Sequence, residues 1–285
     1  MVNPEPQLTG VYRFSSIARP VDPAFPTNRA LLILLPLLAA TNALLTAAGV
    51  ITTSWYAAAI SAALTGFIAW ALARELAPDD NAAAFVALGL AWAASIYSGT
   101  SSVLLPAVAL LLVRIVNRST GLPARPFDTL AILGLCIWAA IDREQSLILL
   151  LAAVAFSLDA ALVDPLRRHF LAAGVCAAVF AGLLVNGTAT TVSDLATRDW
   201  LLLLLASGAI ALIMSGNREP VSPCDVSSRR LDGARVNAGL ALGLLIAVAM
   251  LIANGPSAWF DTALWSCVVA VPVSRAARSI LRRVF

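Results

Sequence analysis

A run of polar residues interrupts the apolar sequence near its middle and could carry chemistry. In "WAAIDREQSLIL", residues 138–149, Asp142, Arg143 and Glu144 stand between two apolar runs. An arginine flanked by two carboxylates can form an ion-pair network at the mouth of a cavity or bind an anionic headgroup. The same residues suit a solvated turn, because the backbone groups at two helix ends need water or side-chain partners. We favour the turn.

Two further carboxylates, Asp261 and Asp159, fall at the edges of apolar runs. Ionised side chains within a bilayer are costly and tend to face a bundle interior or an aqueous path. Asp261 follows two aromatic residues, which favours an acid at the interfacial start of a helix over an ion-coupling residue. For Asp159 we expect contact with cytoplasmic water or an ion pair with Arg167 or Arg168, and a role in a cavity is the alternative.

Neutral polar residues also occur inside the first apolar run. Thr41, Asn42 and Thr46 lie near its middle. Such groups either tie helices together by hydrogen bonds or line a substrate path, and we favour the hydrogen bonds.

Adjacent Asp79 and Asp80 invite comparison with a magnesium site. Hard cations usually require several converging oxygen ligands, and no second aspartate-rich motif matches this one. Pro78 and Asp80 instead fit a helix stop followed by an N-cap. We therefore expect a cap.

Several familiar chemistries are excluded by residue type. The chain has one histidine, His169, and four cysteines without C-x-x-C spacing, so neither a histidine metal cluster nor a zinc site is predicted. The sequence contains no G-x-S-x-G, no H-E-x-x-H and no phosphate-binding glycine loop with lysine. No metal is expected, and the sequence leaves any cofactor open.

The composition is that of an integral membrane protein. Of the 285 residues, 60% are hydrophobic and 12% are charged, and the mean hydropathy is +0.87. Soluble proteins carry roughly 25% charged residues. The fold class expected is an all-α polytopic membrane helical bundle.

Apolar runs predict about ten transmembrane helices. Several runs are short for a complete crossing, which needs about 20 residues. The predicted spans cover residues 29–50, 55–72, 82–97, 101–116, 127–141, 146–163, 170–185, 200–214, 236–253 and 259–273.

The arginines predict the orientation of these spans. All 19 basic residues are arginine, which is typical of a GC-rich bacterial genome. Positive charge is retained on the cytoplasmic side of short loops. With both termini in the cytoplasm, 17 arginines lie inside and only Arg143 and Arg198 lie outside. The expected location is the bacterial cytoplasmic membrane.

The predicted spans define the domain organisation. Residues 1–28 form a proline-rich cytoplasmic segment, residues 29–275 form a single transmembrane domain, and residues 276–285 form a basic cytoplasmic tail. Arginines in this tail at helical spacing suit anionic inner-leaflet lipids. The expected partners are the lipid bilayer and another membrane protein, and we expect no nucleic acid.

The architecture favours a transporter or permease for a small or lipid-linked metabolite. Five spans precede the turn at Asp142 and five follow it, so two related halves would form an inverted repeat, a common transporter plan. One alternative is a membrane enzyme acting on a lipid-linked substrate, with Asp142, Glu144 or Asp261 as catalytic acid. The other is a noncatalytic subunit or scaffold. The sequence favours a noncatalytic protein but leaves the question of an enzyme open.

Overall fold

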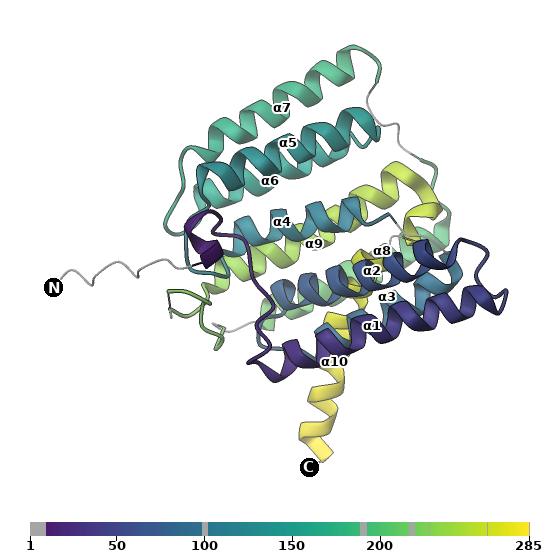
Figure 1. The fold of residues 1–285 in the computed structure, drawn as a ribbon. Helices are drawn as coiled ribbons and strands as arrows, with labels where there is room; N and C mark the ends of the chain where they lie inside the picture. The colour runs from purple at the N-terminus through teal and green to yellow at the C-terminus, as the bar shows by residue number, and fades with distance from the viewer. Residues whose placement is uncertain are drawn as a thin grey trace. The chain divides into compact units, whose positions relative to one another are not determined.

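A computed structural model describes residues 10–98, 102–188, 193–216, 220–227, 229–260 and 262–284. Over these ranges the chain is all-helical, with ten α-helices and no strand (Figure 1). Two short 3₁₀ helices, η1 (Gly10–Arg13) and η2 (Gly255–Phe260), complete the elements. The helices are α1 (Pro26–Ala47), α2 (Trp55–Leu76), α3 (Asn81–Ser98), α4 (Leu104–Asn117), α5 (Pro126–Asp142), α6 (Leu147–Ala161), α7 (His169–Val185), α8 (Thr197–Gly216), α9 (Gly233–Asn254) and α10 (Thr262–Val284).

The predicted all-α class is confirmed, and each predicted span corresponds to one helix. Six helices are long and apolar enough to cross a membrane, namely α1, α2, α3, α8, α9 and α10. Helices α4, α6 and α7 are apolar but shorter. These features indicate a membrane protein.

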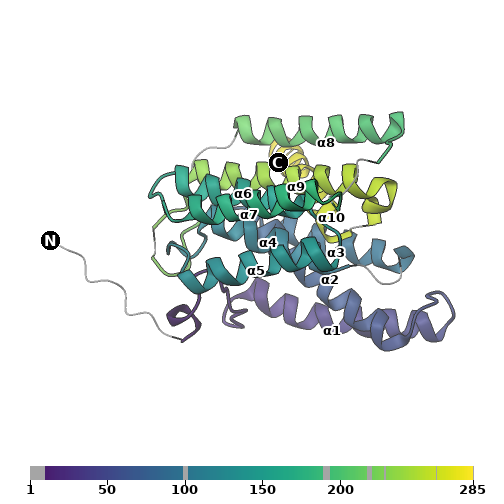
Figure 2. The same ribbon diagram turned by 90° about the horizontal axis from the view of Figure 1, so that it is seen from above.

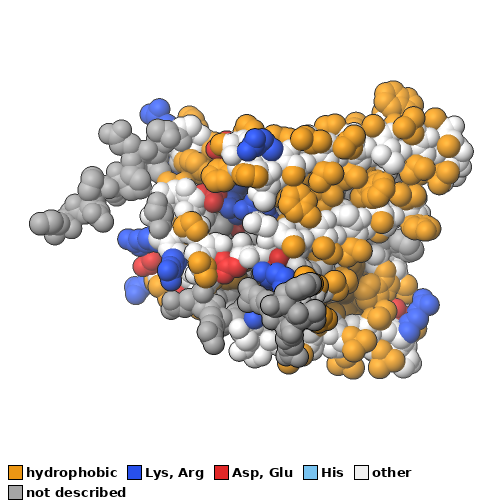
Figure 3. Space-filling view, turned by 90° about the horizontal axis from the view of Figure 1, so that it is seen from below, with side chains coloured by type: hydrophobic (Ala, Val, Ile, Leu, Met, Phe, Trp, Pro, Cys, Tyr) orange, Lys and Arg blue, Asp and Glu red, His pale blue; other side chains and the backbone are white. Residues whose placement is uncertain are grey.

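Large apolar side chains are exposed along the helices. Leu212 is 75% exposed and Leu205 70% exposed, and Figure 3 shows apolar side chains over much of the face that it presents. Burial of apolar area stabilises a protein in water by about 25 cal/mol per Å², so leucines exposed in this way suit a hydrocarbon environment. The exposed leucines therefore support the conclusion, drawn from helix length and composition, that this is a membrane protein.

The chain divides into two compact units, each drawn from three separate segments. Unit 1 comprises residues 1–20, 111–190 and 217–242, and unit 2 comprises residues 21–110, 191–216 and 243–285. Neither unit is a continuous half of the sequence. The inverted repeat of five plus five spans stays a prediction.

In unit 1, α5, α6 and α7 pack against one another, and α6 and α7 run side by side (Figure 1). Their core includes Ile132, Leu149, Phe156 and Cys176, each no more than 1% exposed. Helix α5 begins with Pro126 at its first position, where a missing N–H has no cost. The packed core holds the ends of these helices in place.

In unit 2, α1 packs on α2, and both α2 and α3 pack on α10 (Figure 2). Helices α2 and α3 contribute alanines to this core, including Ala62, Ala69, Ala87 and Ala91, all fully buried. Small side chains let helix backbones approach closely. These alanines therefore allow close packing between the helices of unit 2.

Candidate functional site

The most concentrated group of buried charge in unit 1 surrounds Asp159, near the end of α6. Arg118 donates from Nε to Oδ1 at 2.7 Å and from Nη2 to Oδ2 at 2.9 Å. Arg235 donates from Nη1 to Oδ1 at 2.7 Å, and Nδ1 of His169 lies 2.8 Å from Oδ2. Both Asp159 and His169 are fully buried. We call these four residues, together with Thr129, the Asp159 cluster.

The two arginines also contact the ends of two helices. Arg118 donates from Nη1 to the carbonyl oxygen of Asp164 at 2.8 Å. Arg235 donates to the carbonyl oxygens of Val116 at 2.8 Å and Val163 at 2.5 Å. These carbonyls lie at or just after the ends of α4 and α6, where helices leave unpaired acceptors and a partial negative charge. The helix ends therefore help to balance the second buried guanidinium group.

Thr129 extends the cluster through the imidazole of His169. Its Oγ1 lies 2.9 Å from Nε2 of His169 and also donates to the carbonyl oxygen of Arg125 at 3.1 Å. The ring of Phe156 meets the imidazole edge-on, with centroids 5.0 Å apart. Hydroxyl, imidazole and carboxylate thus lie in sequence, but Nδ1 of His169 forms no hydrogen bond with the carboxylate in this geometry.

Two residues in or beside the cluster have left-handed backbone conformations. Arg118 has φ of +49° and Asp164 has φ of +56°. Non-glycine residues in this region cost about 1–3 kcal/mol each, and they persist where the surrounding structure over-determines them. Here the two residues are hydrogen-bond partners, so the strain accompanies the contact that places Arg118 against Asp159.

The amino-terminal segment is fastened to the same unit. Ser16 donates from its backbone N and its Oγ to Oδ2 of Asp128, at 2.9 and 2.8 Å, and Thr120 donates to the carbonyl oxygen of Ser16 at 2.6 Å. Arg19 pairs with both carboxylate oxygens of Asp225. Asp128 lies in the first turn of α5, so these contacts join the segment to the helix that carries Thr129.

The expected partner of Asp159 was wrong. The carboxylate pairs with Arg118 and Arg235 rather than with Arg167 or Arg168. Arg168 instead donates to the carbonyl oxygen of Ala124. Sequence reasoning considered only neighbouring arginines, whereas the true partners lie 41 and 76 residues away. In the sequence, Asp159 was itself a candidate because a carboxylate falls at the edge of an apolar run, and the other members of the cluster were not identified.

The turn residues lie apart from these contacts. The side chains of Asp142 and Arg143 are 52% and 60% exposed, and Oδ2 of Asp142 lies 3.0 Å from Nε of Arg143. The Arg143 guanidinium also lies over the Trp138 ring at 5.5 Å. Glu144 has φ of +55°, as a tight turn requires. This geometry fits a solvated turn.

In unit 2, Asn42 lies in a buried neutral group. Its Oδ1 accepts from Nε1 of Trp92 at 2.9 Å, and its Nδ2 faces Oγ of Ser95 at 3.4 Å. These contacts tie α1 to α3. The remaining candidate, Asp261, lies outside the described residues.

Asp80 is an N-cap, as expected. Its Oδ1 accepts from the backbone N of Ala83 at 3.2 Å, and its Oδ2 accepts from Nη2 of Arg278 at 2.5 Å. One carboxylate oxygen thus caps the start of α3, and the other accepts a hydrogen bond from Arg278 of α10.

No group of three or more His, Cys, Asp or Glu side chains within the described ranges is placed to hold a metal ion. The four cysteines are free and buried. Burial raises the pKa of the Cys224 thiol, which disfavours the thiolate that binds metals.

Comparison with protein families, with characterised proteins and with solved structures finds no match to this chain. The Asp159 cluster is therefore interpreted from its own geometry.

Proposed function

We propose that this protein is a transporter or permease for a small or lipid-linked metabolite in the bacterial cytoplasmic membrane, with both termini in the cytoplasm. The observation that supports this function is the Asp159 cluster, a fully buried carboxylate with two arginines and a histidine in an apolar helical protein. Ionisable groups inside membrane domains are rare and usually mark ion or substrate pathways.

The helix ends around the cluster fit spans that alternate in direction. Helices α4 and α6 end at the cluster, and α5, α7 and α9 begin beside it. Alternating spans with a cytoplasmic amino terminus place all five of these ends on the cytoplasmic side. The contacts within unit 1 thus fit alternating spans, and the proposed cytoplasmic side of these ends rests on the arginines alone.

We infer from the short helices around the cluster that it lies below the membrane surface. Helix α4 has 14 residues and α6 has 15, so each is only about 21–22 Å long. The hydrocarbon layer is about 30 Å thick. Transporters commonly place the ends of short or broken helices around substrate and coupling ions. All three nitrogens of each guanidinium group already donate to Asp159 or to carbonyl oxygens at helix ends, so a bound substrate would replace one of these contacts.

Counterflow in proteoliposomes tests the proposal. Purified protein is screened for thermal stabilisation by small organic anions, amino acids, sugars and lipid phosphates, and the strongest stabiliser is radiolabelled. We expect saturable exchange that is lost in Arg235→Gln and kept in Asp142→Asn, with both variants checked for folding by size exclusion. Binding followed by chemical conversion would favour an enzyme. Failure to bind solutes, with copurification of another membrane protein, would favour a subunit.

A membrane enzyme is the second candidate, because of one specific observation. Oγ1 of Thr129 lies 2.9 Å from Nε2 of His169, and Nδ1 of His169 lies 2.8 Å from Oδ2 of Asp159 without forming a hydrogen bond, so the three groups have the order of a hydrolase triad but not its hydrogen-bonded geometry. A fluorophosphonate probe tests it, since Oγ1 of Thr129 would bond to phosphorus, fluoride would leave and the imidazole would take the proton. Labelling of Thr129 that His169→Gln abolishes would support the enzyme, and an unlabelled protein would reject it.

A further inference from the structure

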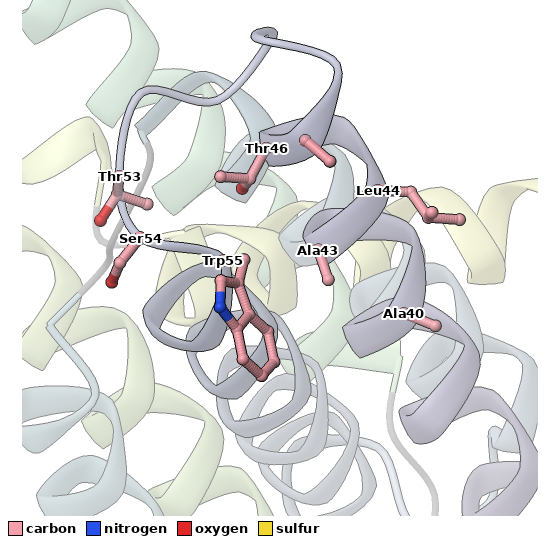
Figure 4. Close-up of a pocket in the computed structure, with 8 residues that line it drawn as sticks. Ala40, Ala43, Leu44, Thr46, Thr53, Ser54 and Trp55 are labelled. Carbon is pink, nitrogen blue, oxygen red and sulfur yellow. The ribbon is translucent and has the colours of Figure 1, made fainter.

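An open pocket lies at the end of the α1–α2 hairpin in unit 2 (Figure 4). Its volume is about 560 Å³, within the range of about 300–1,000 Å³ that is usual for small-molecule sites. Its walls come from α1, from the connecting loop and from the first residue of α2. The lining residues are Ala40, Ala43, Leu44, Thr46, Ala47, Thr53, Ser54 and Trp55.

The pocket exists because one face of α1 carries small side chains. Ala40, Ala43 and Ala47 recur at helical spacing, so they share a face of the helix. Figure 4 shows the Trp55 ring facing the side of α1 that carries Ala40 and Ala43. The result is an apolar slot between methyl groups and an indole ring, and no lining residue is ionisable.

Hydroxyl groups lie along one end of this slot. Thr53 and Ser54 belong to the connecting loop, and Ser54 makes no side-chain capping bond to α2. Thr46 donates to the carbonyl oxygen of Asn42 at 3.0 Å, so its oxygen can still accept. The pocket therefore has an apolar length and an uncharged polar end.

The surroundings of the pocket match the edge of a bilayer. Helices α1 and α2 each have 22 residues, and only 17% of the most apolar stretch of α1 is buried within the protein. Beside the loop, Trp55 and Tyr56 are 64% and 57% exposed, and their rings meet edge-on at 5.9 Å. Exposed tryptophan and tyrosine are enriched where a membrane meets water. The mouth of the pocket thus suits the level of lipid headgroups.

We propose that the α1–α2 pocket binds one chain of a membrane phospholipid, with the ester oxygens of that chain at Thr53 and Ser54. The hydrocarbon lies along the alanine face of α1 against Trp55. Because the lining carries no charge, binding depends on the chain and the ester rather than on the headgroup. This site does not depend on the proposed transport function.

Photolabelling in nanodiscs tests the proposal. The probe is a phosphatidylcholine with a diazirine on one acyl chain, and labelled peptides are mapped by mass spectrometry. We expect saturable labelling of residues 40–55 that unlabelled phosphatidylcholine competes away. Phosphatidylglycerol with the same chains should compete equally well. Preferential competition by the anionic lipid would overturn the uncharged recognition that we infer.

Filling the pocket provides the decisive comparison. Ala43→Phe places a ring in the slot, and labelling of residues 40–55 should fall to the level found on α7. The matched control is Ala178→Phe on α7, an exposed alanine where the same ring leaves labelling of residues 40–55 unchanged. Ala40→Leu is a milder variant in case Ala43→Phe does not fold. Non-saturable labelling that is unaffected by either filling variant would overturn the site and leave only annular lipid.

Discussion

The Asp159 cluster of unit 1 and the Asn42 group of unit 2 bury polar atoms by different means. Asp159 is a carboxylate that pairs with two arginines. These arginines also donate to carbonyl oxygens at or just after the ends of α4 and α6. Asn42 is a neutral amide in the middle of α1, contacting an indole and a hydroxyl of α3. Helix ends offer unpaired backbone groups and helix middles do not. Of these two buried groups, the charged one therefore lies at helix ends and the neutral one lies in the middle of a helix.

The largest effect is expected from Asp159→Ala, which would leave two arginines without their carboxylate. Removing one partner of a buried ion pair costs about 3–5 kcal/mol. Unfolding by denaturant in detergent micelles measures the loss. The control is Asp142→Ala, whose side chain is 52% exposed and whose replacement should leave stability nearly unchanged. Equal losses from both variants would contradict the distinction between cluster and turn.

Gly239→Ala tests the packing beside the cluster. Gly239 follows Arg235 by four residues on α9, and an added Cβ would lie 2.0 Å from Oδ1 of Asn117. Overpacking of this kind costs about 1–3 kcal/mol. In unit 2, a Cβ added at Gly243 would meet the Leu76 side chain at 2.9 Å, which is a less severe overlap, so Gly243→Ala should cost less. Thermal unfolding measures both, and the reverse order would show that unit 1 is not the more tightly constrained region.

Asn42→Ala should cost less than Asp159→Ala. It removes the acceptor of the Trp92 indole N–H, and hydrogen bonds between membrane helices contribute about 0.6 kcal/mol on average and up to about 1.7. Thr41→Ala is the control, because the Thr41 hydroxyl donates to the carbonyl oxygen of Leu37 in its own helix. If Asn42→Ala proves as costly as Asp159→Ala, charge does not distinguish the two groups.

The smallest effect is expected from Arg19→Ala. Arg19 holds Asp225 through two nitrogens, as Arg118 holds Asp159, but the two side chains are 21% and 30% exposed. Exposed ion pairs contribute about 0–1 kcal/mol. A double-mutant cycle with Asp225→Ala isolates the pair. A coupling as large as that of the buried pair would mean that burial is not what strengthens the Asp159 cluster.

The candidate residues show where sequence reasoning was sufficient. The cap at Asp80 was predicted because it depends on residues within one helical turn. The partners of Asp159 were not, because a buried carboxylate can be neutralised by any arginine that the fold brings near it. Nothing in the local sequence distinguishes Arg118 or Arg235 from the other arginines.

The sequence by itself determined the helices, because helix formation and membrane compatibility depend on local composition and on the length of each apolar run. Each of the ten predicted spans has its helix, and six of these helices meet the requirements of a span. Only the tertiary structure decided which helix ends meet around Asp159 and which alanine face lies opposite Trp55. Those contacts join residues of different helices, so they depend on packing between helices.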